Sequence, residues 1–216
     1  MPPQVRMLLV RHGQSTWNAA GRWQGQADPP LSDLGRLQAE LAAGALSGVV
    51  GGALTAVWTS DLRRAAETAR IIAAELGLGD VVLDPGLRER AAGEWSGLTR
   101  HEIEERYPGY LEPRAGRSGF APSDRKRPPG WEHDQQLRAR AVATLARIAE
   151  RATGDVLVVT HGGLIYTLET SLGEPFARLA NAEGRWVVAD GGGLGLGERV
   201  LLLDDDDPRL TVPDQI

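Results

Sequence analysis

Two segments of the chain share one order of residue types: an apolar run, one connecting residue, a histidine and a glycine. The histidine is His12 in the first segment and His161 in the second. An imidazole titrates near neutral pH and can act as a nucleophile, and glycine lets the backbone approach a ligand closely. If the two apolar runs are neighbouring parallel strands, both imidazoles leave the same end of a sheet, where α/β proteins bind ligands. The helix expected after His161 would add amides suited to an anion, so the pattern outlines a phosphate site.

The remaining reactive side chains are few. The chain has no cysteine, which excludes disulfides, thiolate nucleophiles and cysteine-based zinc sites. The other two histidines, His101 and His133, lie in strongly polar, helix-like surroundings, and we expect them on the surface. Histidines and carboxylates are therefore the groups left for chemistry.

The elements that would position these histidines alternate along the chain. Nearly continuous apolar runs at 5–10, 54–58 and 156–159 are typical of strands covered on both faces. Helical patterns lie between them. This order predicts an α/β fold with three layers, α/β/α, around a mainly parallel central sheet.

Three stretches have helical periodicity, and a hairpin is expected near the end. The apolar positions are Leu34, Leu37, Leu41 and Ala45 in the first stretch, Leu62, Ala65, Ala69, Ile72 and Leu76 in the second, and Leu137, Ala141, Leu145 and Ile148 in the third. Ser32 would cap the first helix, and Gly77 would end the second. Runs at 186–189 and 199–203, separated by the glycine-rich stretch 191–197, predict a closing hairpin.

Length and charge limit the possible partners. The 216 residues suit one domain, in which 99–130 forms a specificity loop. Lys and Arg number 24 against 29 Asp and Glu, and this net charge of -5 speaks against nucleic-acid or anionic-membrane partners. We find no signal-peptide pattern and no run of membrane-spanning length, so we expect a cytoplasmic protein. The sequence allows a homodimer but does not require one.

Four motifs follow one another along the chain. They are Arg11-His12-Gly13 continued by Gln14-Ser15-Thr16-Trp17-Asn18, Ser60-Asp61-Leu62-Arg63-Arg64-Ala65 continued by Glu67-Thr68-Ala69, Leu87-Arg88-Glu89 with Gly93, Trp95 and Gly97 behind it, and Thr160-His161-Gly162-Gly163. With these motifs the chain resembles the histidine phosphatase superfamily, in its phosphoglycerate-mutase-like branch. An ordered set of this kind is far more specific than any one of its members.

The resemblance implies a role for each site residue. His12 would be the nucleophile and become a phosphohistidine, and Glu89 would be the proton donor. The groups implied to bind the phosphoryl oxygens are Arg11, Arg64 and His161. The residues implied to contact the substrate are Asn18, Ser15 and Gly162, although Ser15 and Asn18 could simply cap a turn after the strand. This chemistry needs no metal and no cofactor.

Two of the implied site residues have a nearby residue of the same type that could take the same role. Glu94 flanks the same Gly-Trp turn as Glu89, but the spacing from the preceding leucine favours Glu89. Arg63 is adjacent to Arg64, and the motif favours Arg64. The segment 24–26 would either line the pocket or only shape its loop.

The specificity region favours a phosphatase over a mutase. Gly97-Leu98 is followed by Thr99-Arg100, a run more similar to the phosphatase members than to the mutases. The resemblance therefore implies a metal-independent phosphomonoester hydrolase for a small phosphorylated metabolite, such as a sugar phosphate or a phosphorylated sugar acid. The alternatives are a cofactor-dependent phosphoglycerate mutase and a non-catalytic module that binds a phosphorylated ligand. One departure is the run 130–133, Gly-Trp-Glu-His, where the phosphatase branch usually has Gly-Gly-Glu-Ser.

The specificity loop is locally basic. Its cations between Glu112 and Gly130 are Arg114, Arg117, Arg125, Lys126 and Arg127. If the loop folds over the site, it would favour a substrate with a second anionic group. Otherwise it is a solvated basic loop.

Overall fold

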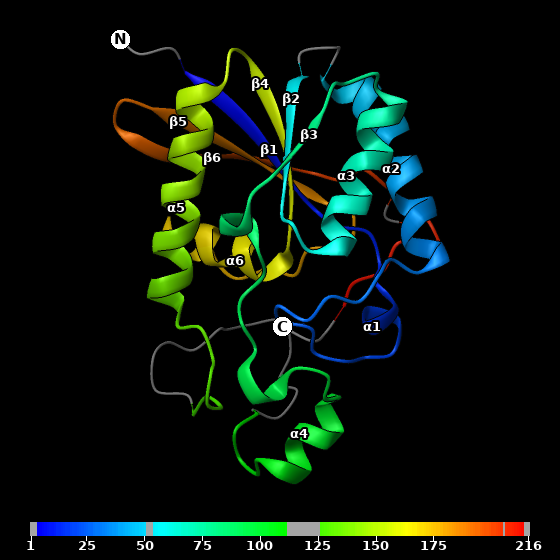
Figure 1. Ribbon diagram of the computed structural model, residues 1–216, viewed down its shortest axis with the longest axis vertical. Helices are drawn as coiled ribbons and strands as arrows, with labels where there is room; N and C mark the ends of the chain where they lie inside the picture. The colour runs from blue at the N-terminus through cyan, green and yellow to red at the C-terminus, as the bar shows by residue number, and fades with distance from the viewer. Residues whose placement is uncertain (1–3, 51–53, 112–125, 205, 214–216) are drawn as a thin grey trace.

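A mixed sheet forms the centre of the computed structural model, which describes residues 4–50, 54–111, 126–204 and 206–213 (Figure 1). Its strands are β1 (Val5–Arg11), β2 (Leu54–Thr59), β3 (Val81–Leu83), β4 (Asp155–Thr160), β5 (Gly184–Asp190) and β6 (Gly193–Val200). The sheet order is β3-β2-β4-β1-β5-β6. The first four strands in this order are parallel, and β5 and β6 add an antiparallel edge. The predicted mainly parallel sheet is confirmed.

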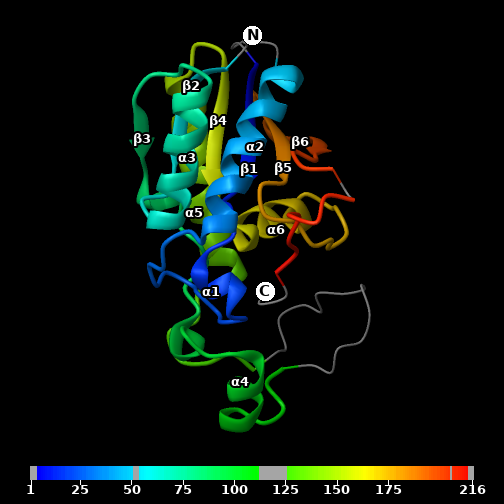
Figure 2. The ribbon, with the colours of Figure 1, turned by 90° about the vertical axis from the view of Figure 1, so that its right-hand side faces the viewer.

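Helices cover both faces of this sheet. They are α1 (Thr16–Ala19), α2 (Asp33–Val50), α3 (Arg63–Glu75), α4 (Arg100–Arg106), α5 (Asp134–Arg151) and α6 (Gly162–Ser171). Helices α2 and α3 lie on one face and α5 and α6 on the other, while α1 and α4 lie beyond one end of the sheet (Figures 1 and 2). The three-layer prediction is therefore confirmed. In the described part of the chain, no helix is both long and apolar enough to cross a bilayer.

Alternate residues of β1 serve two different cores. Met7 and Leu9 pack in the core under α5 and α6, and Leu8 and Val10 pack in the core under α2 and α3. Because both faces are covered, Met7 to Val10 include no polar residue, and the exposed Arg6 is the one interruption in the apolar run 5–10.

The predicted first helix is present as α2, but the apolar positions that indicated it are not its most buried ones. Leu37 is 37% exposed, whereas Ala42 and Leu46 are completely buried. This helix packs on α3 through small side chains, and alanines contribute little to a hydrophobic pattern read from sequence. The cap was predicted correctly, since the Ser32 hydroxyl accepts from the Gly35 amide at 3.0 Å.

The closing hairpin exists, but its bounds differ from the prediction. Strand β6 begins at Gly193, so most of the glycine-rich stretch is strand rather than turn, and 201–203 lies outside it. At Gly197 a Cβ would come within 2.7 Å of the Trp186 Cβ on β5, so glycine at this strand position allows the close approach.

A third, aromatic cluster holds the described parts of the specificity loop beyond the end of the sheet. The Trp95 ring is completely buried among Trp23, Trp131 and Tyr107. Of the loop cations, Lys126 and Arg127 lie over aromatic rings, while the other three fall outside the described residues. His101 and His133 are exposed, as predicted.

Candidate active site

Four chain segments with chemically active side chains follow the carboxyl ends of the four parallel strands. Arg11 and His12 come at the end of β1, and His161 follows β4, its parallel neighbour. Arg64 starts α3 after β2, and Glu89 follows β3. Parallel strands bring their carboxyl ends to one edge of the sheet, and so residues far apart in sequence meet there.

The His12 imidazole is buried and held in one orientation. Its Nδ1 lies 2.6 Å from the Gly13 carbonyl oxygen, which makes Nδ1 the protonated nitrogen. Its Nε2 therefore carries the lone pair, and the Arg64 Nε donates to it at 3.2 Å. Burial, and then the charges of Arg64 and Arg11, lower the pKa of His12 well below 6.5. The ring is thus neutral and nucleophilic at neutral pH.

The two predicted histidines do meet. The ring centroids of His12 and His161 are 5.0 Å apart, with the ring planes inclined at 65°, and His161 is completely buried. Burial lowers the pKa of His161 well below 6.5, and the nearby Arg64, His12, Arg11 and Arg140 act in the same direction.

Several polar nitrogens at this point lack partners. Among the described residues, the buried nitrogens without a hydrogen bond include the Arg11 Nε and both ring nitrogens of His161. An unpaired buried polar group costs about 1 to 3 kcal/mol, so such groups gathered in one place call for an explanation. An oxyanion bound between them would accept from the Arg11 Nε and from the ring nitrogen of His161 that carries the proton.

Arg64 carries its charge into the same place. Its side chain is completely buried, and burial lowers its pKa to about 10, which leaves it charged at neutral pH. Its two terminal nitrogens donate to the Ala27 carbonyl at 2.8 Å and the Gly25 carbonyl at 2.9 Å. The neighbouring Arg63 is exposed, which agrees with the prediction that Arg64 rather than Arg63 belongs to the site. The segment 24–26, whose role was left open, thus helps to aim a site arginine.

Glu89 lies against the start of α6. Its carboxylate accepts from the Gly163 amide at 3.0 Å and from the Arg90 amide at 2.7 Å. A Cβ at Gly163 would come within 2.2 Å of the Glu89 Oε1, so only glycine allows this approach. The rival Glu94 is exposed and accepts from the Tyr107 hydroxyl at 2.6 Å.

The residues predicted to contact substrate differ in their placement. Ser15 is completely buried, where it caps α1 by accepting from the Asn18 amide and donates to Gln24. This placement favours the capping role for Ser15. Asn18 is partly exposed, and Gly162 is the first residue of α6, after the cap His161. Their contact with substrate stays a prediction.

Sequence reasoning missed some of the residues that hold the site together. Arg140 on α5 donates to the carbonyls of Gly86 and Arg88, just before Glu89, at 2.9 and 2.8 Å. The Asn181 side-chain amide donates to the His12 carbonyl at 2.9 Å. An arginine inside a polar helix gives no local signal that its guanidinium serves a distant loop.

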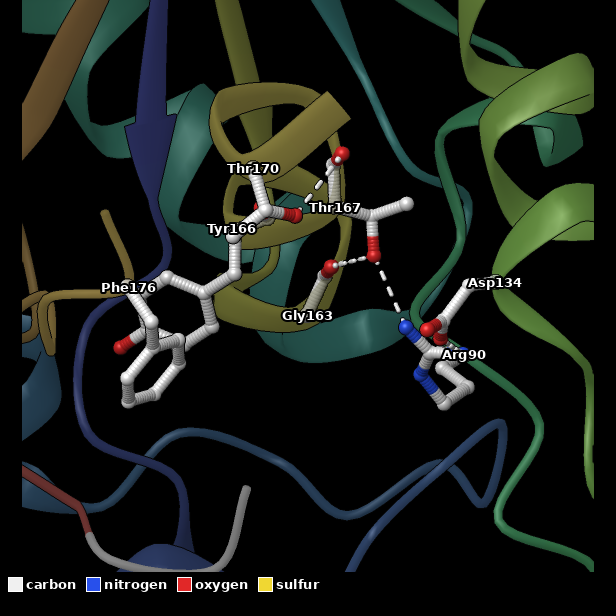
Figure 3. A pocket seen from close by; sticks show the side chains of 7 residues that line it. All are labelled: Arg90, Asp134, Gly163, Tyr166, Thr167, Thr170 and Phe176. Atoms are coloured by element: carbon white, nitrogen blue, oxygen red, sulfur yellow. Dashed lines mark hydrogen bonds and ion pairs between the residues drawn. The ribbon is translucent and has the colours of Figure 1, made fainter. Parts of the chain in front are cut away.

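A pocket opens beside Gly163 (Figure 3). The Gly163 amide also donates to the Glu89 carboxylate. On one side the rings of Tyr166 and Phe176 lie 4.9 Å apart. On the other side Arg90 pairs with Asp134 at 2.6 Å. The pocket therefore has one aromatic wall and one wall that carries the Arg90–Asp134 ion pair.

The comparisons with known proteins agree with this geometry. Residues 7–187 match the model of the histidine phosphatase superfamily (branch 1). The chain belongs to the histidine phosphatase superfamily, and it is a phosphatase-type enzyme of that family.

Curated relatives and solved structures are named for both activities discussed above. The metal-independent phosphoserine phosphatase of Arabidopsis thaliana is 40% identical over 163 residues, 74% of this chain and 66% of that protein. The phosphoglycerate mutase-like protein 4 of the same plant is 39% identical over 169 residues, 76% of this chain and 69% of that protein. A mycobacterial glucosyl-3-phosphoglycerate phosphatase, solved with VO3, superposes with a TM-score of 0.73 at 30% identity, covering 89% of this chain and 97% of that one.

Proposed function

We propose that this protein is a metal-independent phosphomonoesterase that hydrolyses a small phosphorylated metabolite through a phosphohistidine at His12. The observation that carries the proposal is the placement of the neutral His12 Nε2 beside Arg64 and among the unpaired nitrogens of Arg11 and His161. A nucleophile and a set of oxyanion donors lie together, as phosphoryl transfer requires.

Two half-reactions follow from these positions. The lone pair on the His12 Nε2 attacks phosphorus, the phosphorus–oxygen ester bond breaks, and Glu89 gives its proton to the leaving alcohol. Water then attacks the phosphohistidine, Glu89 takes a proton from that water, and phosphate leaves with the nitrogen restored. Arg11, Arg64 and His161 would hold the phosphoryl oxygens in both steps.

The alcohol part of the substrate would lie on the side of Glu89, the carboxylate that would protonate the leaving oxygen. The named substrates of two relatives, phosphoserine and glucosyl-3-phosphoglycerate, support a small phosphorylated metabolite as the substrate. A sugar phosphate or a phosphorylated sugar acid is the expected substrate.

The deciding experiment is phosphate release from a panel of phosphoesters with EDTA present, run beside a mutase assay. We expect release that the chelator does not reduce and that is greatest for one member of the panel, because His12 rather than a metal-bound water makes the attack. Loss of activity with EDTA that added metal restores would contradict metal independence. Isomerisation of 3-phosphoglycerate primed with 2,3-bisphosphoglycerate, without release, would indicate a mutase, and silence in both assays a binding module.

The buried histidines predict a pH dependence. Since the pKa values of His12 and His161 are lower in the fold than the ordinary 6.5, the unfolded chain binds more protons below that pH. The free energy of unfolding should therefore fall on acidification below about pH 6.5, by at most roughly 1.4 kcal/mol per pH unit for each histidine. Urea titrations at several pH values measure this slope.

Activity should follow the same groups. Because His12 stays unprotonated, kcat/KM should keep its value down to below pH 6.5. An acid limb centred above pH 6.5 would contradict the assignment of His12 as the nucleophile.

A further inference from the structure

Two buried amide side chains hold the backbone on either side of Gly13, next to the proposed nucleophile. The Asn181 Nδ2 donates to the His12 carbonyl at 2.9 Å, and the Gln38 Oε1 accepts from the Gln14 amide at 2.7 Å. Both amide side chains belong to completely buried residues. The Gly13 carbonyl lies between these two contacts and accepts from the His12 Nδ1, so a shift of this backbone would turn the imidazole.

A single hydroxyl joins the two amides. The Thr211 Oγ1 accepts from the Gln38 Nε2 at 3.0 Å and donates to the Asn181 Oδ1 at 2.8 Å. Each amide has one donor end and one acceptor end, so these bonds select one orientation for each. An Asn181 turned over would set its oxygen against the His12 carbonyl. A Gln38 turned over would set its NH2 group against the Gln14 amide.

The backbone next to Asn181 has a strained conformation, which the surrounding contacts must maintain. Ala182 has φ 61°, the only positive φ of a non-glycine residue in the described part of the chain, and it is completely buried. Such conformations persist where the structure over-determines them, and they gather at functional sites. The Thr211 carbonyl accepts from the Asn181 amide at 2.8 Å, and the Arg209 carbonyl accepts from the Gln38 Nε2 at 2.5 Å. The segment 209–211 thus contacts both amides through its backbone as well.

We propose that Thr211 is a positioning residue, whose hydroxyl locks Gln38 and Asn181 as a clamp that keeps the His12 Nε2 aimed at phosphorus. The proposal rests on the proposed role of His12 as nucleophile. In the structure the side-chain hydrogen bonds of the clamp go to the backbone at His12 and Gln14 and to one another, and none of them goes to a side-chain nitrogen of Arg11 or His161. The clamp should therefore affect kcat more than the affinity for phosphate.

The test compares Thr211→Val, which removes the hydroxyl at constant size, with Thr211→Ser, which keeps it. With p-nitrophenyl phosphate as substrate, Thr211→Val should lower kcat roughly 10- to 100-fold, the loss expected from a misplaced reacting atom. The inhibition constant of inorganic phosphate should stay within about threefold, and Thr211→Ser should restore most of kcat. Val212→Ala is the matched control, because Val212 is adjacent and 52% exposed.

A second variant tests the clamp as a unit. Gln38→Met removes the amide at similar size and should reproduce the loss in kcat. This variant keeps the clamp testable if Thr211→Val does not fold. The double variant Thr211→Val with Gln38→Met should be no worse than the more impaired single one, because both changes disable the same clamp. If the double variant lost kcat by the product of the two single losses, the proposal would be overturned. Equal losses of kcat in Thr211→Val and Thr211→Ser would also overturn it, and so would a loss of phosphate affinity in place of kcat.

Failure of the clamp and failure of the proposed function give different results. If the wild-type protein forms no phosphohistidine, the function of His12 as nucleophile is wrong. The clamp is then tested by the ¹⁵N resonances of the His12 ring, which should shift in Thr211→Val and not in Val212→Ala. Unchanged His12 resonances in Thr211→Val would overturn the clamp.

Discussion

Replacing His12 by alanine should lower kcat for every phosphomonoester by at least about 10⁴-fold, because the reaction loses the atom that accepts the phosphoryl group. The rest of the anion site would remain: Arg11, Arg64 and His161 would still bind inorganic phosphate or vanadate. Steady-state kinetics and calorimetric binding of vanadate measure the two effects separately. We expect lost turnover with retained oxyanion binding.

The matched control for this change is His101→Ala. His101 is exposed on α4, and its ion-pair contact is with Glu105 on the same helix. It should keep wild-type kinetics. Wild-type protein quenched in base should yield a phosphoprotein that is stable in base and loses its phosphate in acid, and His12→Ala should yield none. A His12→Ala variant with more than about one per cent of wild-type kcat would contradict the nucleophile assignment.

Replacing Glu89 by glutamine should lower kcat/KM for an alkyl phosphate by about 10²- to 10⁴-fold, the range expected for loss of a general acid. An alkoxide is a poor leaving group and needs a proton as the ester bond breaks. The loss should be much smaller for p-nitrophenyl phosphate, whose phenolate leaves without one. Measuring kcat/KM for both esters gives the difference directly.

The control is Glu94→Gln, which changes the rival carboxylate. Glu94 is exposed and accepts from Tyr107, away from the Glu89 contact with α6, so this variant should stay near wild type for both esters. Equal losses for the two esters in Glu89→Gln would show that Glu89 is not the proton donor. Wild-type behaviour of Glu89→Gln with a large loss in Glu94→Gln would transfer the role to Glu94.

Much of the site was predictable because its signals are local. The strand, histidine and glycine pattern fixes where His12 and His161 leave the sheet, and parallel pairing of β1 with β4 then brings them together. The spacing within the motifs likewise separates Arg64 from Arg63. These inferences need only neighbouring residues and the general geometry of parallel sheets.

The predicted details of the fold were wrong where alanine or glycine occupies a position that the hydrophobic pattern does not mark. The buried face of α2 is made of alanines as well as leucines, and Leu37 lies outside it. In the closing hairpin, most of the glycine-rich stretch that indicated a turn belongs to β6, and Gly197 allows a close approach to the Trp186 Cβ on β5. In both cases the packing partner on another element determines what a small residue does.

The sequence by itself determined the family, the layered fold and the chemical groups of the site. Only the tertiary structure decided how those groups are held: Asn181 reaches His12, which lies 169 positions away, and Arg140 supports the loop of Glu89. Thr211 completes the contact with Asn181. Such hydrogen bonds join single polar atoms across the fold, and they leave no periodicity or spacing in the sequence, because their geometry exists only once the chain has packed.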